Sequence, residues 1–220
     1  MISNQGKNNF IRLPESCSGR GSKITIIGND NSVILGENCI LNNINIRLKG
    51  NNIHLKVGNN VEMTGVIASL FMNTSLFIGD NSTLGNGEIT IAEENNIHIG
   101  KDCMFANGYE IRTSDMHPIY SLKNGERINF GANIYIGNHI WLGRDVVILK
   151  GVTLADNIMV GIRSVVTKSF EQPNSVLAGT PAKLLSQNVI WGRKMYHKTM
   201  FDDSTLKEYY ENFRENNDNQ

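Results

Sequence analysis

Aliphatic residues return at every sixth position in the second half of the chain. The positions are Ile136, Leu142, Ile148, Leu154, Val160 and Val166. An α-helix repeats its apolar face about every 3.6 residues and a half-buried strand every two, so neither element explains a period of six. A six-residue period predicts a chain that turns a corner at each repeat and stacks its coils into a parallel β-helix.

The first half of the chain carries a related pattern, in which an aliphatic residue is followed by glycine and then by polar turn formers. These segments begin at Ile27, Leu35, Val57, Ile78 and Ile99. Glycine and asparagine suit tight corners because they tolerate positive φ angles. The last three segments follow one another at intervals of 21 residues, which predicts coils of three six-residue sides with a few extra corner residues. We expect about seven such coils.

Two regions depart from the repeat and divide the chain. Ile111 and Ile136 are 25 residues apart, one coil plus seven, and the excess falls in residues 112–133. A loop projecting from a rigid solenoid is a typical place for functional residues. We therefore expect an N-terminal cap over residues 1–23, a β-helix over 24–183 with an active-site loop at 112–133, and a short C-terminal helical tail over 184–220.

Composition excludes several classes of function. The 220 residues have a formal net charge of zero, which does not favour a nucleic-acid or anionic-membrane partner. The first residues lack the apolar core of a signal peptide, and no apolar run approaches the length of a transmembrane segment, so we expect a cytoplasmic protein. Three cysteines, Cys17, Cys39 and Cys103, lack disulfide or zinc spacing, the histidines lack ligand spacing, and no metal is expected.

Several motifs make the sequence similar to a known family. They are the six-residue repeats, the loop SDMHPI (114–119), the long run at 136–170, the ending PNSVLAGTPAKLL (173–185) and the tail VIWGRK (189–194). Together they resemble the hexapeptide-repeat acetyltransferases, which include the maltose, galactoside and xenobiotic acetyltransferases. Within that group the loop and tail are most similar to bacterial polysaccharide O-acetyltransferases, such as those that act on polysialic acid capsules.

The resemblance implies a left-handed β-helix, a homotrimer, and acetyl-CoA as co-substrate in the groove between neighbouring subunits. The acceptor would be a hydroxyl of a sugar or surface polysaccharide. His117 would be the general base that takes the hydroxyl proton, because imidazole titrates near neutral pH. Asp115 either orients His117 or is a simple turn residue. Asn86 matches the family asparagine that reaches the reacting groups from the neighbouring subunit.

The cofactor side of the site follows partly from spacing and partly from the family. Arg144 and Ile162 are 18 residues apart, which places them on successive coils along one edge. The family's CoA contacts map onto these two positions and onto Thr167 and Lys168, and Lys183 is a further candidate for the CoA phosphates. Trp141 is expected to face outward, either as a wall of the site or as part of a trimer interface.

Alternative functions remain at this point. One is an N-acetyltransferase that acts on a nucleotide-linked amino sugar and uses a similar prism and base. Another is a β-helix without catalytic activity, or one that holds a metal as some related carbonic anhydrases do. The sequence does not identify the acceptor sugar, its modified hydroxyl or the role of Trp191.

Overall fold

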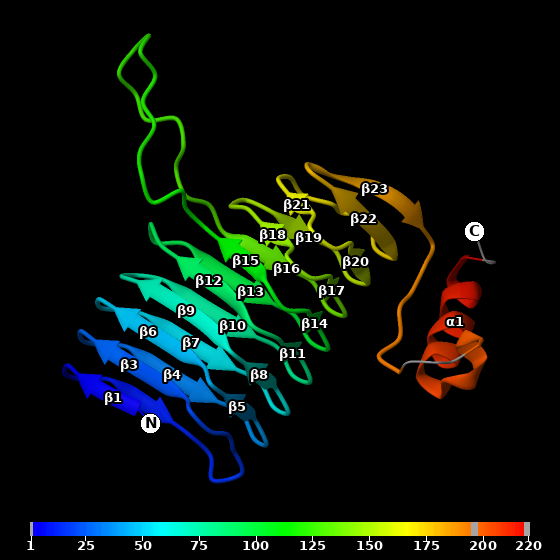
Figure 1. The fold of residues 1–220 in the computed structure, drawn as a ribbon, viewed down its shortest axis with the longest axis horizontal. Coiled ribbons are helices and arrows are strands. Elements are labelled where there is room, and N and C mark those ends of the chain that lie inside the picture. The colour runs from blue at the N-terminus through cyan, green and yellow to red at the C-terminus, as the bar shows by residue number, and fades with distance from the viewer. Residues whose placement is uncertain (1, 195–197, 218–220) are drawn as a thin grey trace.

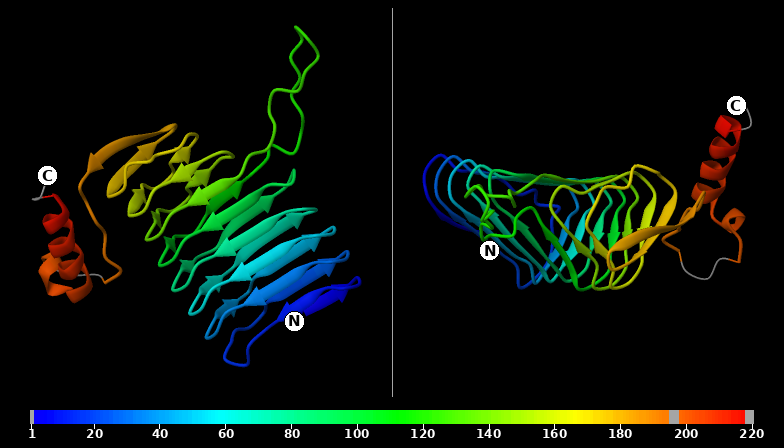
Figure 2. Two further views of the ribbon diagram at one scale, coloured as in Figure 1. Left: turned by 180° about the vertical axis from the view of Figure 1, so that it is seen from behind. Right: turned by 90° about the horizontal axis from the view of Figure 1, so that it is seen from above.

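The computed structural model of the protein is a prism of stacked parallel coils with a projecting loop and a C-terminal helix (Figures 1 and 2). The structure describes residues 2–194 and 198–217. Three long sheets form the sides of the prism, because each coil contributes one strand to each sheet. We call the sheets 1, 2 and 3 in the order in which the chain first enters them, and we name each edge by the two sheets that it joins.

Sheet 1 consists of β1 (Ile2–Gln5), β3 (Lys23–Ile27), β6 (Asn45–Lys49), β9 (Val66–Phe71), β12 (Gly87–Ile91), β15 (Tyr109–Arg112), β18 (Val147–Ile148) and β21 (Val165–Val166). Sheet 2 consists of β2 (Phe10–Arg12), β4 (Ser32–Leu35), β7 (His54–Val57), β10 (Ser75–Ile78), β13 (Asn96–Ile99), β16 (Ile134–Ile136) and β19 (Thr153–Leu154). Sheet 3 consists of β5 (Ile40–Asn42), β8 (Glu62–Thr64), β11 (Thr83–Leu84), β14 (Met104–Phe105), β17 (Trp141–Leu142), β20 (Ile158–Val160), β22 (Ser175–Gly179) and β23 (Ala182–Gln187).

The aliphatic repeat forms the core of the prism. On sheet 2 the stacked inward positions are Leu35, Val57, Ile78, Ile99, Ile136 and Leu154, all at most 1% exposed. Burying an aliphatic side chain of this size stabilises a fold by about 1.5–3 kcal/mol. The predicted interval of 21 residues between Val57, Ile78 and Ile99 is confirmed by their direct register.

Corner asparagines stack as regularly as the core. Asn38, Asn60 and Asn81 have φ angles of 56°, 54° and 60°. The Asn38 amide donates to the Asn60 side chain at 3.3 Å, and the Asn60 amide donates to Asn81 at 3.1 Å. Asparagine is suited to these corners because it adopts the left-handed backbone conformation and its side chain forms a ladder of hydrogen bonds along the edge.

The β-helix starts earlier than expected. The expected cap over residues 1–23 is wrong in its boundary, because β1 pairs in register with β3 and β2 pairs with β4. The described residues form about eight coils, one more than expected, as the eight strands of sheet 1 indicate. The first coil escaped detection because it closes the end of the stack, where inward residues such as Ile2 and Ile11 are only partly buried.

The insertion after β15 is larger than expected. Ile136 pairs with Ile99, and Ile111 pairs with Ile148, so Ile111 and Ile136 belong to different sheets. Neighbouring coils are offset by 21 or 22 residues before the insertion and by 18 after it. At the insertion the offset is 37 residues. The expected excess of seven residues was therefore wrong, and residues 113–133 project from edge 1/2 between β15 and β16 (Figure 1).

The C-terminal segment differs from the expected boundary at residue 184. β23 is a strand that folds back antiparallel on β22. Beyond it the chain continues to the 3₁₀ helix η1 (Met200–Asp202) and to α1 (Ser204–Asn217). Tyr209 of α1 donates a hydrogen bond to Asn174 on the prism at 2.7 Å.

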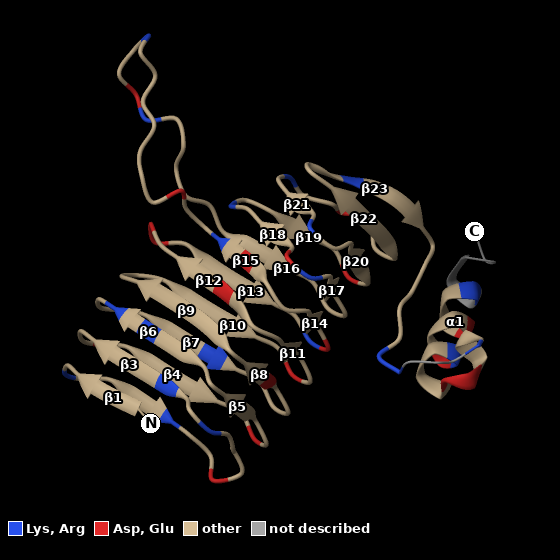
Figure 3. Ribbon diagram, viewed as in Figure 1, with Lys and Arg blue, Asp and Glu red and all other residues tan. Residues whose placement is uncertain are grey.

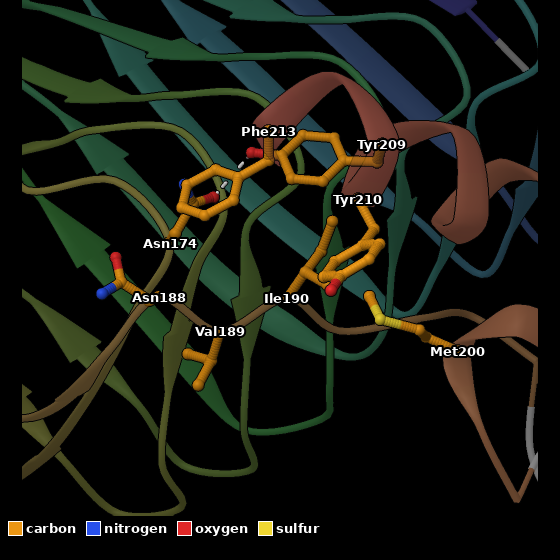
Figure 4. Close-up of a pocket in the computed structure, with 8 residues that line it drawn as sticks. All are labelled: Asn174, Asn188, Val189, Ile190, Met200, Tyr209, Tyr210 and Phe213. Carbon is orange, nitrogen blue, oxygen red and sulfur yellow. Dashed lines mark hydrogen bonds between the residues drawn. The ribbon is translucent and has the colours of Figure 1, made fainter. Parts of the chain in front are cut away.

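A small apolar pocket of about 80 Å³ lies between α1 and the chain that leads to it (Figure 4). Its lining residues are Asn174, Asn188, Val189, Ile190, Met200, Tyr209, Tyr210 and Phe213. Lys and Arg as well as Asp and Glu are scattered over the prism and occur on α1 (Figure 3). None of the helices among the described residues has the length and apolar character needed to cross a membrane.

Candidate active site

Glu93 fixes the base of the projecting loop. It lies at edge 1/2 between β12 and β13, one coil before the loop. Its carboxylate accepts hydrogen bonds from the hydroxyl of Ser114, where the loop starts, and from the backbone N–H of Gly131 at 3.1 Å, where it ends. Arg127 donates a further bond at 2.7 Å. The bonds from Arg127 and Ser114 lower the pKa of Glu93 to about 2, so an ionised carboxylate joins the two ends of the loop.

The outer part of the loop is an antiparallel finger. Tyr120 and Arg127 form a β-bridge, and the N–H of Ile128 donates to the carbonyl of Ile119 at 2.9 Å. Local pairing of this kind gives the backbone of a long insertion its own hydrogen-bond partners. The loop is therefore an ordered projection that presents side chains away from the prism.

His117 lies where the finger begins, and its side chain is exposed. It sits between Met116, whose φ of 64° is left-handed, and Pro118, which disfavours a helical conformation at His117. Its carbonyl accepts a hydrogen bond from the side-chain amide of Asn129 at 2.9 Å. The backbone is thus held, while the imidazole makes no hydrogen bond within the described residues and faces outward.

Asp115 has partners other than His117. Its carboxylate accepts hydrogen bonds from the ammonium of Lys150 and from the amide of Asn129. These two bonds, the one from Lys150 first, lower the pKa of Asp115. Of the two roles left open for Asp115, the structure shows no hydrogen bond to the His117 ring within one chain, because the Lys150 cation on the next coil attracts the carboxylate.

Asn86, Arg144 and Ile162 lie along a different edge, 3/1, between the strands of sheets 3 and 1. Successive coils stack closely there: the carbonyl of Asn86 accepts from the N–H of Gly108 at 2.6 Å, and the carbonyl of Arg144 accepts from Arg163 at 2.8 Å. The side chains of Asn86, Arg144 and Ile162 are exposed. The predicted stacking of Arg144 and Ile162 on successive coils agrees with this register.

Two other candidates lie on strands of sheet 3. Lys183 is exposed on β23, in register with Ala178, next to the turn that joins β22 and β23. Trp141 begins β17, is 40% exposed and faces outward as expected. Its ring centroid is 6.0 Å from that of Trp191.

Thr167 and Lys168 follow β21 at edge 1/2, the edge from which the loop projects. Both are exposed, and the ammonium of Lys168 lies 5.6 Å from the centroid of the Phe170 ring. Lys150 occupies the same edge one coil earlier. Lys150 is paired with Asp115, whereas Lys168 has no carboxylate partner among the described residues, so the two lysines share an edge but differ in their surroundings.

The candidate residues of one chain thus form two groups. His117, Asp115, Thr167 and Lys168 lie on edge 1/2, whereas Asn86, Arg144 and Ile162 lie on edge 3/1. Sheet 1, whose strands contain two to six residues, separates the two edges. The structure does not bring the two groups together within one chain.

The cysteines do not add a catalytic group to this site. Cys17, Cys39 and Cys103 are free thiols, and burial raises the pKa of Cys103 to about 12. This protonated, enclosed thiol fits a packing role rather than a catalytic one. Among the residues placed by the structure, no three His, Cys, Asp or Glu side chains form a group suited to a metal ion.

Sequence reasoning missed three residues of the loop network, namely Glu93, Asn129 and Lys150. Glu93 and Lys150 are one coil before and one coil after the loop, and Asn129 is 12 residues from His117. Their meeting depends on the stacking of coils across the insertion. The only available signals were the edge positions of Glu93 and Lys150 on the coils that flank the loop and the place of Asn129 within the loop.

Comparison with known proteins defines the family. No protein-family model matches the sequence. A polysialic acid O-acetyltransferase of Neisseria meningitidis is 56% identical over 210 residues, which cover 96% of this chain and 98% of the relative. A polysialic acid O-acetyltransferase of Escherichia coli O1:K1 is 31% identical over 156 residues, which cover 71% of this chain and 50% of the relative.

Solved structures agree with this relationship. The crystal structure of a polysialic acid O-acetyltransferase superposes with a TM-score of 0.93 at 56% identity, covering 96% of this chain and all of the other. That of a second polysialic-acid-specific acetyltransferase gives a TM-score of 0.87 at 27% identity, with 97% and 98% coverage.

The fold is accordingly the left-handed parallel β-helix of the hexapeptide-repeat acetyltransferases, as the family resemblance implied, and the protein is an acyltransferase. The chain belongs to the polysialic acid O-acetyltransferase family.

Proposed function

We propose that this protein transfers the acetyl group of acetyl-CoA to a hydroxyl of polysialic acid, with His117 as general base. The observation that carries the proposal is the exposed imidazole of His117 on an ordered loop, in a chain 56% identical over nearly its whole length to a polysialic acid O-acetyltransferase. The loop places this ring outside the prism, where a polymer has access to it.

The chemistry needs one base and one acyl donor. A ring nitrogen of His117 takes the proton of the acceptor hydroxyl while the hydroxyl oxygen attacks the thioester carbonyl carbon. The tetrahedral intermediate then collapses, the carbon–sulfur bond breaks, and the CoA thiolate takes the proton from His117. An acetyl ester and free CoA are the products.

The complete site is proposed to lie between two chains of a homotrimer. In a closed ring of three prisms, edge 1/2 of each chain faces edge 3/1 of the next, which brings His117 and Asn86 of neighbouring chains together. Acetyl-CoA would lie in this groove against Arg144, Ile162, Thr167 and Lys168, with Lys183 and Trp141 at its margin.

Exposed apolar residues of the loop support association. They are Met116, Ile119, Tyr120, Leu122, Ile128 and Phe130, each at least 42% exposed. Large apolar side chains gathered on a projection commonly mark a protein interface. A neighbouring prism would cover this surface.

The parts of the chain then have separate roles. The coils provide the edges of the site, residues 112–133 carry the proposed general base His117, and the described residues after β23 pack on the outside of the prism. We propose that the enzyme acts in the cytoplasm, where acetyl-CoA is available and where its three free thiols suit a reducing compartment.

An acceptor panel tests the proposal. The enzyme is incubated with labelled acetyl-CoA and, separately, with polysialic acid, a simple galactoside and a nucleotide-linked amino sugar, and the products are examined by mass spectrometry. We expect acetylation of polysialic acid that mild alkali removes, as for an ester. Alkali-stable acetylation of the amino sugar, or no transfer to polysialic acid, would contradict it.

A further inference from the structure

Asn129 holds the backbone on both sides of His117. Its side-chain nitrogen donates to the carbonyl of His117 at 2.9 Å and to the carboxylate of Asp115 at 2.8 Å. Its side-chain oxygen accepts from the N–H of Ile119 at 2.6 Å. The side-chain amide of Asn129 therefore contacts His117, Asp115 two residues before it and Ile119 two residues after it.

Lys150 joins this arrangement to the rigid part of the protein. It lies at edge 1/2 of the coil that follows the loop, and its side chain is only 24% exposed. Its ammonium donates to the carboxylate of Asp115 and, at 3.1 Å, to the backbone carbonyl of Asn129. A cation on the prism thus anchors both strands of the loop at the level of His117.

Few other side chains determine where the His117 ring lies. The imidazole has no hydrogen-bond partner within the described residues, so the position of its backbone and its rotamer preference define its direction. The Glu93 contacts act at the base of the loop, at Ser114 and Gly131. Asn129 and Lys150, in contrast, contact the backbone and the neighbours of the proposed general base, His117.

We propose that Asn129 and Lys150 are positioning residues, which set the reach of His117 towards the acceptor hydroxyl without touching either substrate. This inference rests on the proposed role of His117. Displacing a catalytic group by about 1 Å can reduce the rate about 100-fold, because the reacting atoms must lie within a narrow range of distances. We call the contacts of Asn129 and Lys150 with the loop the clamp. Loss of the clamp should therefore lower kcat and leave acetyl-CoA binding nearly unchanged.

The sharpest variant is Asn129→Asp. It keeps the shape of the side chain and an acceptor for Ile119, but replaces the donor with an oxygen that faces the His117 carbonyl and the Asp115 carboxylate. Lys150→Met removes the cation, and Lys150→Arg restores it. Matched controls are Asn96→Asp and Lys56→Met, both on the outer face of sheet 2.

Steady-state kinetics with acetyl-CoA and polysialic acid, together with Tm, provide the test. We expect Asn129→Asp to lower kcat by about 10- to 100-fold and Lys150→Met by about 10-fold, with KM for acetyl-CoA within about twofold of the parent. Lys150→Arg should recover at least about half of the parental kcat, and the controls should match the parent. If Asn129→Asp does not fold, the comparison of Lys150→Met with Lys150→Arg carries the test.

His117→Ala is measured alongside to separate two kinds of failure. If His117→Ala is inactive while Asn129→Asp and Lys150→Met keep the parental kcat, the positioning role is overturned and the proposed function stands. A loss of kcat that Lys150→Arg does not recover, or one matched by a similar rise in KM for acetyl-CoA, also overturns it. If His117→Ala retains full activity, both proposals fall.

Discussion

The imidazole of His139 and the indole of Trp191 are stacked, with centroids 4.1 Å apart and planes 13° apart. The indole N–H of Trp191 donates to the carbonyl of His139 at 2.9 Å. Two residues further on, Arg193 donates to the carboxylate of Asp102 and, at 2.8 Å, to the carbonyl of Cys103. The segment beyond β23 is thereby attached to edge 2/3, and this attachment brings Trp191 next to Trp141.

Trp191→Ala should release this segment from the prism. Trp191 is only 5% exposed, and truncating a buried aromatic residue costs about 3–5 kcal/mol. We expect a lower Tm and faster proteolytic cleavage after residue 187. Phe201→Ala is a suitable control because Phe201 is 54% exposed and its truncation should change Tm little. An unchanged Tm and cleavage rate for Trp191→Ala would contradict the docking.

Glu93→Gln should remove a contribution to stability that depends on pH. The pKa of Glu93 is lowered to about 2 from 4.5, so its stabilisation is complete above about pH 4.5 and is lost as pH falls towards 2. The Tm of Glu93→Gln should therefore lie several degrees below the parent at pH 7, and the difference should shrink on acidification. Thermal unfolding between pH 3 and 7 measures it. A difference that stays constant or widens at low pH is the contrary result.

The sequence predicted the coils because the buried column repeats without interruption wherever no residues are inserted. Val57, Ile78 and Ile99 keep their spacing since each occupies the same inward position of sheet 2. The prediction failed at the insertion, because a period cannot be counted through residues that do not stack. The interval from Ile111 to Ile136 was thus taken as one enlarged coil, although the two residues lie on different sheets. Ile111 pairs with Ile148, and Ile136 pairs with Ile99.

The arrangement of the candidate residues was predictable only in part. His117 was proposed from its motif, and its catalytic role stays a prediction, whereas the shared edge of Arg144 and Ile162 followed from their 18-residue spacing and agrees with the register of the coils. The clamp made by Asn129 and Lys150 was not predictable, because its residues meet only when the loop folds back on the following coil. The separation of His117 from Asn86 likewise depends on which edge each occupies, which is a property of the wound chain.

Mixed trimers test the division of the site between chains. His117→Ala and Asn86→Ala chains are each expected to form weakly active trimers. When the two are co-expressed in equal amounts, a site is intact only where His117 of one chain meets Asn86 of another, so about one quarter of the sites should be active. Recovery to about a quarter of parental activity is the expected result. Activity no higher than that of the separate variants would contradict a shared site.

Lys168→Ala should weaken binding of acetyl-CoA rather than the chemical step. An exposed ammonium that meets a phosphate as a point charge contributes about 1–1.5 kcal/mol, or about a 10-fold change in affinity. We expect KM for acetyl-CoA to rise about 5- to 10-fold, with kcat within about twofold, and the effect to diminish at high salt. Lys56→Met, distant on sheet 2, is the control. A fall in kcat at unchanged KM would assign Lys168 a different role.

The kinetics of His117→Ala on polysialic acid test the central claim most directly. Removal of a general base from an otherwise intact site should lower kcat by about 10²- to 10⁴-fold while KM for acetyl-CoA changes little, because the ring acts on the hydroxyl proton and not on CoA binding. The account predicts a folded protein that binds acetyl-CoA and scarcely acetylates polysialic acid. A His117→Ala enzyme that forms the acetyl ester at the parental rate would contradict it.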